Sequence, residues 1–177
     1  MTFHSVSFVF FLSAVYTAFF FSCDRWRWLV LLFASYVFYA SFLAWQLPVS
    51  LALVTVISFF CAAKLGQTSD ETRRSRIFWS GTISCLLVLL IMKYLPWLFA
   101  SGMTSGQGTV VSLPITIGVS YFTFQAISYL ADTYIGVQDP ETHFGFHALS
   151  LAFFPKISQG PIERAGDLLP QLKKTYE

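Results

Sequence analysis

Charged side chains are scarce in this sequence of 177 residues, where Asp, Glu, Lys and Arg together supply 11%. Soluble domains usually contain about 25% charged residues, so this scarcity excludes water as the main solvent of the chain. Hydrophobic residues supply 55% instead, and Phe alone occurs 20 times. Trp and Tyr stand near the ends of apolar runs, as they do at the two surfaces of a bilayer. These aromatic residues are Trp26, Trp28, Tyr39, Trp45, Trp79, Tyr94 and Trp97.

Cysteine and the common catalytic motifs are also in short supply. The three cysteines, Cys23, Cys61 and Cys85, are an odd number without metal-ligand spacing, so we expect small buried side chains rather than a metal site. The sequence contains no Gly-rich phosphate loop, no nucleophile elbow and no internal repeat. Nothing in it resembles a nucleic-acid-binding surface, and we expect no bound cofactor and no nucleic-acid partner.

A basic segment before the first apolar run is missing as well. Only His4, which we interpret as an exposed terminal residue, precedes that run, whereas Arg25 and Arg27 follow it. A secretory signal peptide has the opposite arrangement. We therefore expect an uncleaved first span, in a protein whose main partner is the lipid bilayer.

Runs of about 17–25 apolar residues are long enough to cross a hydrocarbon core. Since several such runs occur, the sequence predicts an all-α, polytopic transmembrane bundle with about five spanning helices, in a single membrane domain over 1–177. The second and third runs are separated only by "QLP", which predicts a tight helical hairpin. The runs are Ser5–Phe21, Trp28–Trp45, Pro48–Ala63, Ile77–Phe99 and Leu113–Leu130.

The fifth run differs from the others because it carries polar side chains. These side chains would be costly if they faced lipid, so we expect a central helix buried among its neighbours. Gln125, deep in this run, either lines a substrate path or joins helices by hydrogen bonding. The other polar residues of the run are Thr116, Ser120, Thr123 and Ser128.

Lys and Arg gather in alternate loops. One group is Arg25 and Arg27, and another lies between Lys64 and Arg76, whereas the stretches "WQLP" and "ASGMTSGQGTVVS" have no cation. Because cationic loops stay in the cytoplasm, this pattern predicts a multi-pass protein of the cell (inner) membrane with its amino terminus outside.

The segment at about 143–162 is apolar at first but is short for a span. If it crossed the membrane, Lys156 and Arg164 would lie outside, against the charge pattern. Pro155 and the pair Gly160-Pro161 would permit the non-helical backbone of a turn. We therefore expect a re-entrant or interfacial element that enters and leaves on the cytoplasmic side.

Few side chains could carry chemistry. His143 and His147 are four residues apart and would share a helical face, as metal ligands do, but no completing ligands are evident and we expect interfacial, non-catalytic histidines. Asp132 either binds substrate or is a carboxylate at a helix end. Lys93 either reaches toward the interface or faces a cavity. These residues alone indicate no reaction.

Two stretches, "LPITIGVSYFTFQAISYLADTYIG" and "FHALSLAFFPKISQGPIERAGDLLPQL", resemble the membrane-bound O-acyltransferase family, in particular its bacterial alginate O-acetyltransferase-like branch. The early stretches "LLFASYVFYASF" and "LIMKYLPWLF" are also similar to the family. Thr116 stands where the family usually has Gly. The resemblance covers nearly the whole chain but only the amino-terminal portion of a family fold, which has about eleven helices.

The resemblance implies transfer of an acyl group, with acetyl the leading candidate, from a cytoplasmic acetyl-CoA-like thioester to a hydroxyl of an extracellular or periplasmic polysaccharide. It implies a catalytic histidine in a Trp- and His-rich stretch that this sequence lacks, so we assign no catalytic residue to the chain. Partners would be the carboxy-terminal remainder of the enzyme and polysaccharide-modifying proteins. We expect the donor path to include Gln125, Asp132, Lys156, Gly160, Pro161 and Arg164, with the last cations either meeting the donor or anchoring to lipid.

Two other interpretations stay open. A non-catalytic membrane scaffold, or a truncated fragment of such an enzyme, would keep the fold without its chemistry. A transporter would explain the polar fifth run but not the Gly-Pro-Ile match.

Overall fold

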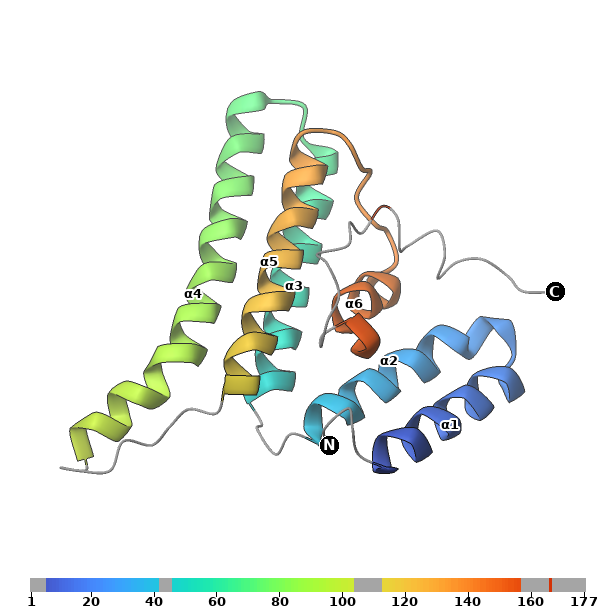
Figure 1. The fold of residues 1–177 in the computed structure, drawn as a ribbon. Helices are drawn as coiled ribbons and strands as arrows, with labels where there is room; N and C mark the ends of the chain where they lie inside the picture. The colour runs from blue at the N-terminus through green and yellow to red at the C-terminus, as the bar shows by residue number, and fades with distance from the viewer. Residues whose placement is uncertain (1–5, 42–45, 104–112, 157–165, 167–177) are drawn as a thin grey trace.

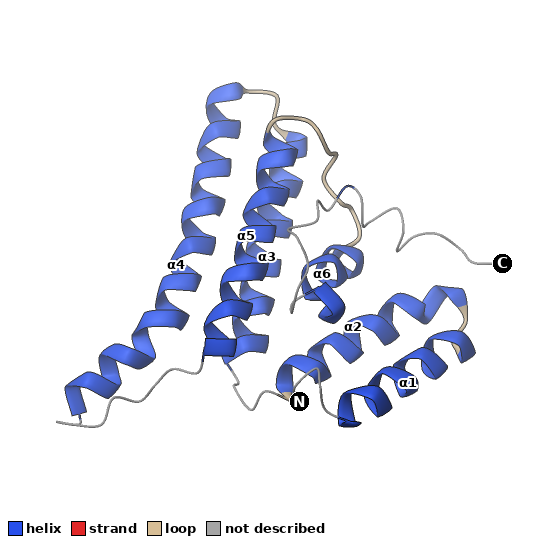
Figure 2. Cartoon of the chain, in the orientation of Figure 1, coloured by secondary structure: helices blue, strands red, loops and turns tan. Residues whose placement is uncertain are grey.

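The computed structural model describes residues 6–41, 46–103, 113–156 and 166. Within these residues every regular element is helical, as the apolar runs predicted (Figures 1 and 2). Three long helices lie side by side, a pair of shorter helices lies beside them, and one short helix packs between the two groups (Figure 1).

The shorter pair consists of α1 (Val6–Phe21) and α2 (Asp24–Ala40), joined by a two-residue connection. Their facing sides meet through aromatic rings: the rings of Phe11 and Phe38 have centroids 6.1 Å apart. Phe154, from far along the chain, places its ring 5.5 Å from Phe11 and 5.6 Å from Phe38. This aromatic cluster joins the pair to the end of the short helix.

The long helices are α3 (Gln46–Gln67), α4 (Glu71–Met103) and α5 (Leu113–Tyr134). Helix α5 packs against α3, α4 and the short helix, as its polar side chains predicted. A glycine permits the close approach of all three long helices, since a Cβ atom at Gly81 would lie 3.0 Å from Sγ of Cys61 and 3.2 Å from Leu130.

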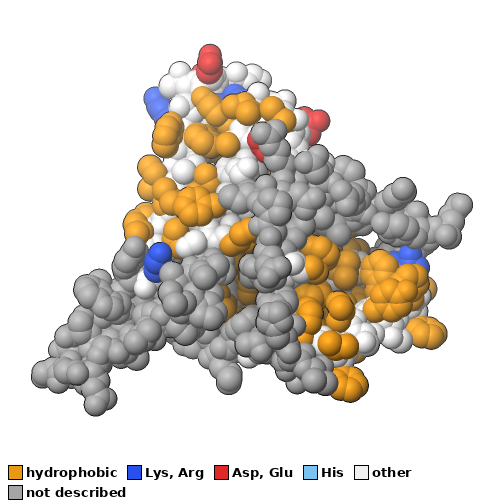
Figure 3. Space-filling model, viewed as in Figure 1, with side chains coloured by type: hydrophobic (Ala, Val, Ile, Leu, Met, Phe, Trp, Pro, Cys, Tyr) orange, Lys and Arg blue, Asp and Glu red, His pale blue; other side chains and the backbone are white. Residues whose placement is uncertain are grey.

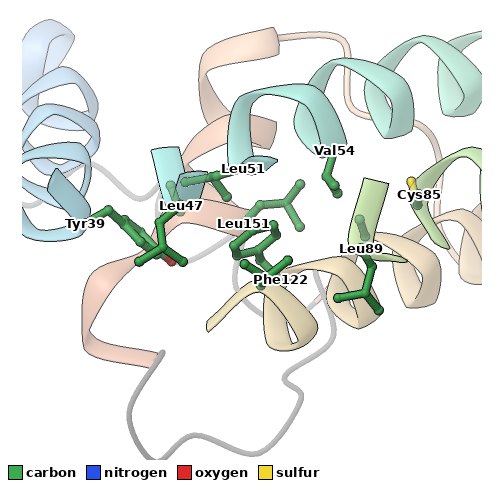
Figure 4. Close-up of a cluster of buried hydrophobic side chains, with 11 residues drawn as sticks. Tyr39, Leu47, Leu51, Val54, Cys85, Leu89, Phe122 and Leu151 are labelled. Carbon is green, nitrogen blue, oxygen red and sulfur yellow. The ribbon is translucent and has the colours of Figure 1, made fainter. Parts of the chain in front are cut away.

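The main hydrophobic cluster lies where α2, the long helices and the short helix converge (Figure 4). Buried hydroxyl groups in the same helices bond to their own backbone, as in the 2.7 Å bonds from Thr55 to the Leu51 carbonyl and from Thr123 to the Val119 carbonyl. These bonds satisfy the hydroxyls without water. The labelled members of the cluster are Tyr39, Leu47, Leu51, Val54, Cys85, Leu89, Phe122 and Leu151.

Two described segments are long and apolar enough to cross a membrane by length and composition, Leu47–Gln67 and Glu71–Lys93. Shorter apolar helices cover Phe8–Phe21 and Trp26–Ala40. Hydrophobic side chains cover much of the visible described surface (Figure 3), as expected of a chain that meets lipid. The count of about five spans stays a prediction.

Two predicted boundaries were wrong. "QLP" belongs to the first turn of α3, where proline is tolerated because its missing N–H needs no partner. Helix α4 begins at Glu71 rather than Ile77. Its polar first turn is stabilised by Asp70, whose carboxylate accepts a 3.2 Å bond from the Thr72 N–H. Hydrophobic runs alone could not reveal these polar helix ends.

The predicted re-entrant segment contains a short helix, α6 (Phe144–Ala152), and a 3₁₀ turn, η1 (Phe154–Lys156). Nine residues of α-helix rise roughly 14 Å, about half of a hydrocarbon core, so α6 is too short to cross it. Residues 157–165 of the predicted element lie outside the described residues.

Candidate functional site

Helix α6 is the centre of the candidate site because it is buried on almost every side. Seven of its residues, Gly145 and His147–Ala152, are buried. It packs on α2, α3 and α5, and Gly145 lies so close to the indole of Trp28 that no larger side chain fits. A short helix enclosed in this way needs partners for the polar groups that it takes out of water.

A hydrogen bond ties α6 to α3. Nε2 of His147 lies 2.8 Å from Oγ of Ser58, and both residues are fully buried. The Ser58 hydroxyl donates to the Thr55 carbonyl at 3.2 Å. Since a hydroxyl has one hydrogen, we assign the imidazole proton to Nε2, which donates to Ser58. Nδ1 is then an acceptor, and no described residue bonds to it.

The surroundings of His147 keep its ring neutral. The rings of Tyr129 and Phe59 lie 4.6 Å and 5.8 Å from it, measured between centroids. Burial lowers the pKa of His147 to about 4, while the carboxylate of Glu141 acts in the opposite direction. A neutral imidazole at pH 7 is consistent with the assigned donor and acceptor roles.

A second hydrogen bond ties α6 to α5. Nε2 of Gln125 donates to the Ser150 carbonyl at 2.9 Å. That carbonyl belongs to the last turn of α6, where the helix itself provides no donor. Gln125 is 2% exposed, and its Oε1 has no partner among the described residues. Gln125 therefore acts as the interhelical hydrogen-bond donor that the sequence left open as one of two roles.

A third tie joins the end of α6 to α2. The Phe154 N–H donates to Oγ of Ser35 at 3.3 Å, and Ser35 donates to the Leu31 carbonyl at 2.8 Å. One side-chain contact from each of α2, α3 and α5 therefore fixes α6 and the start of η1. These three contacts fix the described end of the segment that precedes the Gly-Pro-Ile stretch in the sequence.

The loop before α6 is fixed by a bond to α5 and by bonds among its own residues. The Glu141 N–H donates to the Tyr129 hydroxyl at 2.8 Å, and the Glu141 carboxylate accepts from the His143 N–H at 3.1 Å. Nδ1 of His143 in turn accepts a 3.1 Å bond from the Gly145 N–H and caps the amino end of α6. These bonds fix the backbone of Glu141 and His143, which lead directly into α6.

Helix α5 ends in a Schellman motif, which directs the chain into this loop. The Val137 N–H donates to the Asp132 carbonyl at 2.9 Å, and the Gly136 N–H to the Thr133 carbonyl at 3.4 Å. Gly136 has a φ of +78°, in the left-handed region that glycine tolerates without a Cβ clash.

Arg74 joins the carboxyl ends of two helices. Its guanidinium donates to the Tyr134 carbonyl at 2.9 Å and the Thr133 carbonyl at 3.4 Å, at the end of α5. It also donates to the Leu65 and Thr68 carbonyls, at 3.3 and 3.4 Å, at the end of α3. A cation in this position offsets the negative ends of both helix dipoles.

The sequence-predicted site residues fall into two groups. Gln125 and Asp132 are described, and Asp132 is an 8% exposed residue in the last turn of α5 rather than a surface carboxylate. Lys156 is the last residue of η1. Gly160, Pro161 and Arg164 lie outside the described residues.

The expectation of two interfacial histidines was wrong for His147. His143 is exposed at the helix cap, whereas His147 is fully buried, because α6 turns the latter toward α3. Among the described residues no three His, Cys, Asp or Glu side chains gather in a metal-binding group. Sequence reasoning missed Ser35 and Ser58, since a serine within an apolar run gives no sign of its distant partner.

The sequence of the chain is similar to those of named bacterial proteins. The chain is 36% identical to the protein named "Probable alginate O-acetylase AlgI" of Pseudomonas aeruginosa, over 97% of the chain and 34% of that protein. It is 31% identical to the protein of the same name from Azotobacter vinelandii, over 97% of the chain and 36% of the relative. No protein-family model and no solved structure matches the chain significantly.

A relative with a different printed name matches too. The "Peptidoglycan O-acetyltransferase" of Helicobacter pylori is 28% identical over 82% of the chain and 32% of its own length. The chain thus spans about a third of the curated relatives that it matches. These relatives confirm the resemblance: the chain corresponds to the amino-terminal portion of an alginate O-acetylase-like membrane-bound O-acyltransferase.

Proposed function

We propose that the chain forms the amino-terminal part of an enzyme that transfers an acetyl group from a cytoplasmic thioester, of the acetyl-CoA type, to a polysaccharide hydroxyl. The single observation that supports this proposal is the likeness of 97% of the chain to named alginate O-acetylases. A relative named for peptidoglycan extends the range of acceptors to a second polysaccharide.

The reaction itself is a simple exchange. The acceptor hydroxyl oxygen bonds to the thioester carbonyl carbon, the carbon–sulfur bond breaks, and the leaving thiolate takes up a proton. A histidine in the part of the relatives that this chain does not match would act as general base for the hydroxyl proton. His147 and Ser58 are both 0% exposed, so these two residues would contribute positioning rather than chemistry.

Helix α6 supplies that positioning. Its ties to Ser35, Ser58 and Gln125 fix the start of η1, from which the chain proceeds to the Gly-Pro-Ile stretch. Lys156 and Arg164 flank this stretch in the sequence, where two cations would attract an anionic donor. Gly160 and Pro161 would supply a break in the backbone of this stretch. Asp132 lies in the last turn of α5, which precedes α6 and this stretch in the sequence.

The loop between α5 and α6 supports a common cytoplasmic end in the inner membrane, with the amino terminus outside. Pro140 of this loop packs on Gly66, near the cationic α3–α4 turn. A Cβ atom added to Gly66 would lie only 2.5 Å from Cγ of Pro140. The His143 ring packs on Trp28, beside the cationic α1–α2 turn, with centroids 5.1 Å apart. One loop therefore contacts the helices next to both cationic turns, as expected if both face the cytoplasm.

The test begins with the nucleotide sequence beyond the Glu177 codon. A continuation with a Trp- and His-rich helix supports the enzyme, and the continuous product should then transfer acetyl groups from acetyl-CoA to alginate or peptidoglycan. The 177-residue chain alone should transfer none. A continuous product that is folded but inactive with both polymers would favour a non-catalytic membrane scaffold.

A further inference from the structure

The two described segments that are long and apolar enough to cross a membrane form one hairpin, in which α3 and α4 are joined by residues 68–70. Each helix carries an exposed apolar stripe, a row of hydrophobic side chains that recurs every three or four residues along one side of the helix. All of these side chains are between 40% and 58% exposed. The α3 stripe consists of Val49, Leu53, Val56 and Phe60, and the α4 stripe consists of Trp79, Ile83, Leu87 and Leu90.

A cation continues each stripe at the end next to the turn. Lys64 follows Phe60 by four residues on α3, and Arg76 precedes Trp79 by three residues on α4. Each cation therefore lies on the same side of its helix as that aromatic residue. Both cations are exposed. Although the two helices run in opposite directions (Figure 1), both stripes thus end in an aromatic ring followed by a cation at the same end of the hairpin.

The other charges near the turn are engaged elsewhere. Arg74 donates to carbonyl groups at the ends of α3 and α5, and Nε of Arg73 lies 3.4 Å from the carboxylate of Asp70. Glu71 precedes Arg76 by five residues, which places its side chain about 140° around the helix. The side chains of the two cations that end the stripes have no ion pair and no hydrogen bond within the described part of the chain. Both positive charges are therefore available to a ligand.

We propose that each stripe binds one anionic phospholipid, whose acyl chains lie along the apolar side chains and whose phosphate meets Lys64 on α3 or Arg76 on α4. The first and last residues of each stripe are eleven positions apart. That separation corresponds to roughly 17 Å of helix, and so to about one leaflet of a 30 Å hydrocarbon core. A cation about one turn beyond the stripe then lies at the level of the headgroups, where the lipid phosphates are.

Charge complementarity selects this ligand. A zwitterionic lipid has its own cation beside the phosphate, whereas an anionic lipid leaves a net negative charge for the protein to meet. Phe60 and Trp79, the aromatic residues next to the cations, are placed as aromatic residues are at membrane interfaces. In Figure 3, Lys or Arg side chains lie beside the α3–α4 turn, and hydrophobic side chains continue along the visible flank of α4. This site does not depend on the proposed acetyl transfer.

The test measures lipid retention by native mass spectrometry. The purified chain in mild detergent is titrated with phosphatidylglycerol or with phosphatidylcholine of identical acyl chains. We expect two molecules of phosphatidylglycerol to bind about fivefold more tightly than phosphatidylcholine, the effect of about one cation each. Lys64→Gln and Arg76→Gln should each leave one such molecule, and the double variant should leave none. Lys93→Gln, which removes an equal charge from a position farther along α4, should leave both.

The apolar part of the site is tested with a matched pair of variants. Leu53→Asn places an amide in the α3 stripe and should weaken the retention of one of the two lipids, whereas Leu12→Asn makes the same change at a similarly exposed position of α1 and should not. If Leu53→Asn fails to fold, Leu53→Ala should weaken the same lipid by removing contacts with its chain. Equal binding of the two lipids, or a preference that survives in the double variant, would overturn the proposal. An equal loss in Lys93→Gln would also overturn it, because net charge rather than a site would then explain the preference.

Discussion

The imidazole of His147 and the hydroxyl of Ser58 meet at 2.8 Å in the interior of the molecule, although the two residues are 89 positions apart in the chain. This contact closes a short helix onto a long one without any charge. It also accounts for one imidazole nitrogen, while the other nitrogen has no partner among the described residues. The consequences of this arrangement can be measured.

Replacing Ser58 by alanine removes the acceptor of the His147 N–H. Because a buried donor without a partner costs about 1–3 kcal/mol, the free energy of unfolding should fall by that amount. Thermal or denaturant unfolding in a mild detergent provides the measurement. Ser84→Ala is the matched control, since the Ser84 hydroxyl is exposed and bonds to its own helix. An equal loss in both variants would contradict the assigned role.

The same histidine predicts how stability depends on pH. Burial lowers the pKa of His147 to about 4, below its ordinary value of 6.5, so the unfolded chain takes up the proton first. Stability is therefore full above pH 6.5 and declines as the pH falls toward 4, by roughly 3 kcal/mol in total. His147→Gln should remove this part of the decline, whereas His143→Asn, at the exposed cap, should retain it. An unchanged decline in His147→Gln would show that other groups cause it.

Gln125→Leu tests whether the amide joins helices or serves a substrate. Loss of its bond to the Ser150 carbonyl should lower stability by about 0.6–2 kcal/mol. Phe124→Leu, at the neighbouring and half-exposed position, is the control and should lower it less. Normal stability of Gln125→Leu, combined with lost acetyl transfer in the continuous enzyme, would instead assign Gln125 to the substrate path.

Arg74 should matter far more than its neighbour Arg76. Arg74→Gln removes a charge that contacts the ends of α3 and α5, and we expect a loss of about 1–3 kcal/mol in the free energy of unfolding. Arg76→Gln removes the same charge from an exposed position on the same helix and should cost little. Similar unfolding midpoints for the two variants would exclude the capping role.

The sequence was sufficient for the helical class, for the central place of α5 and for the break at the start of η1. Each depends on a local property: apolar length, polar side chains in an apolar run, or proline. The ends of α3 and α4 were misjudged because a capped polar turn continues a helix beyond its apolar run. Asp70 and Glu71 show this, since their acidic side chains favour the first turn rather than end the helix.

The site itself was less predictable. Gln125 was noticed because an amide is rare in an apolar run, but its partner is a backbone carbonyl that no sequence pattern marks. Ser58 and His147 lie on different helices, and only the packing of α6 brings them together. Arg74 was counted as one cation among several, because charge patterns record where a loop lies and not which carbonyls a guanidinium reaches.

The last prediction concerns topology. With the native cysteines replaced by serine, a cysteine at Ser105 should react with an impermeant thiol reagent from outside, whereas one at Thr72 should not. To test the re-entrant element, cysteines are introduced at Thr142 and Asp167. Both should react with the reagent from the cytoplasm alone. Thr142 is exposed, while Leu149 inside α6 is 0% exposed and would be a poor reporter.

Two results would contradict this topology in different ways. Labelling of Thr72 from outside would reverse the orientation, and the side from which the donor approaches would change with it. Labelling of Asp167 from outside, with Thr142 still cytoplasmic, would mean that the segment after α6 crosses the membrane. Since Lys156 and Arg164 would then be carried toward the outside, the proposed attraction of an anionic cytoplasmic donor would be lost.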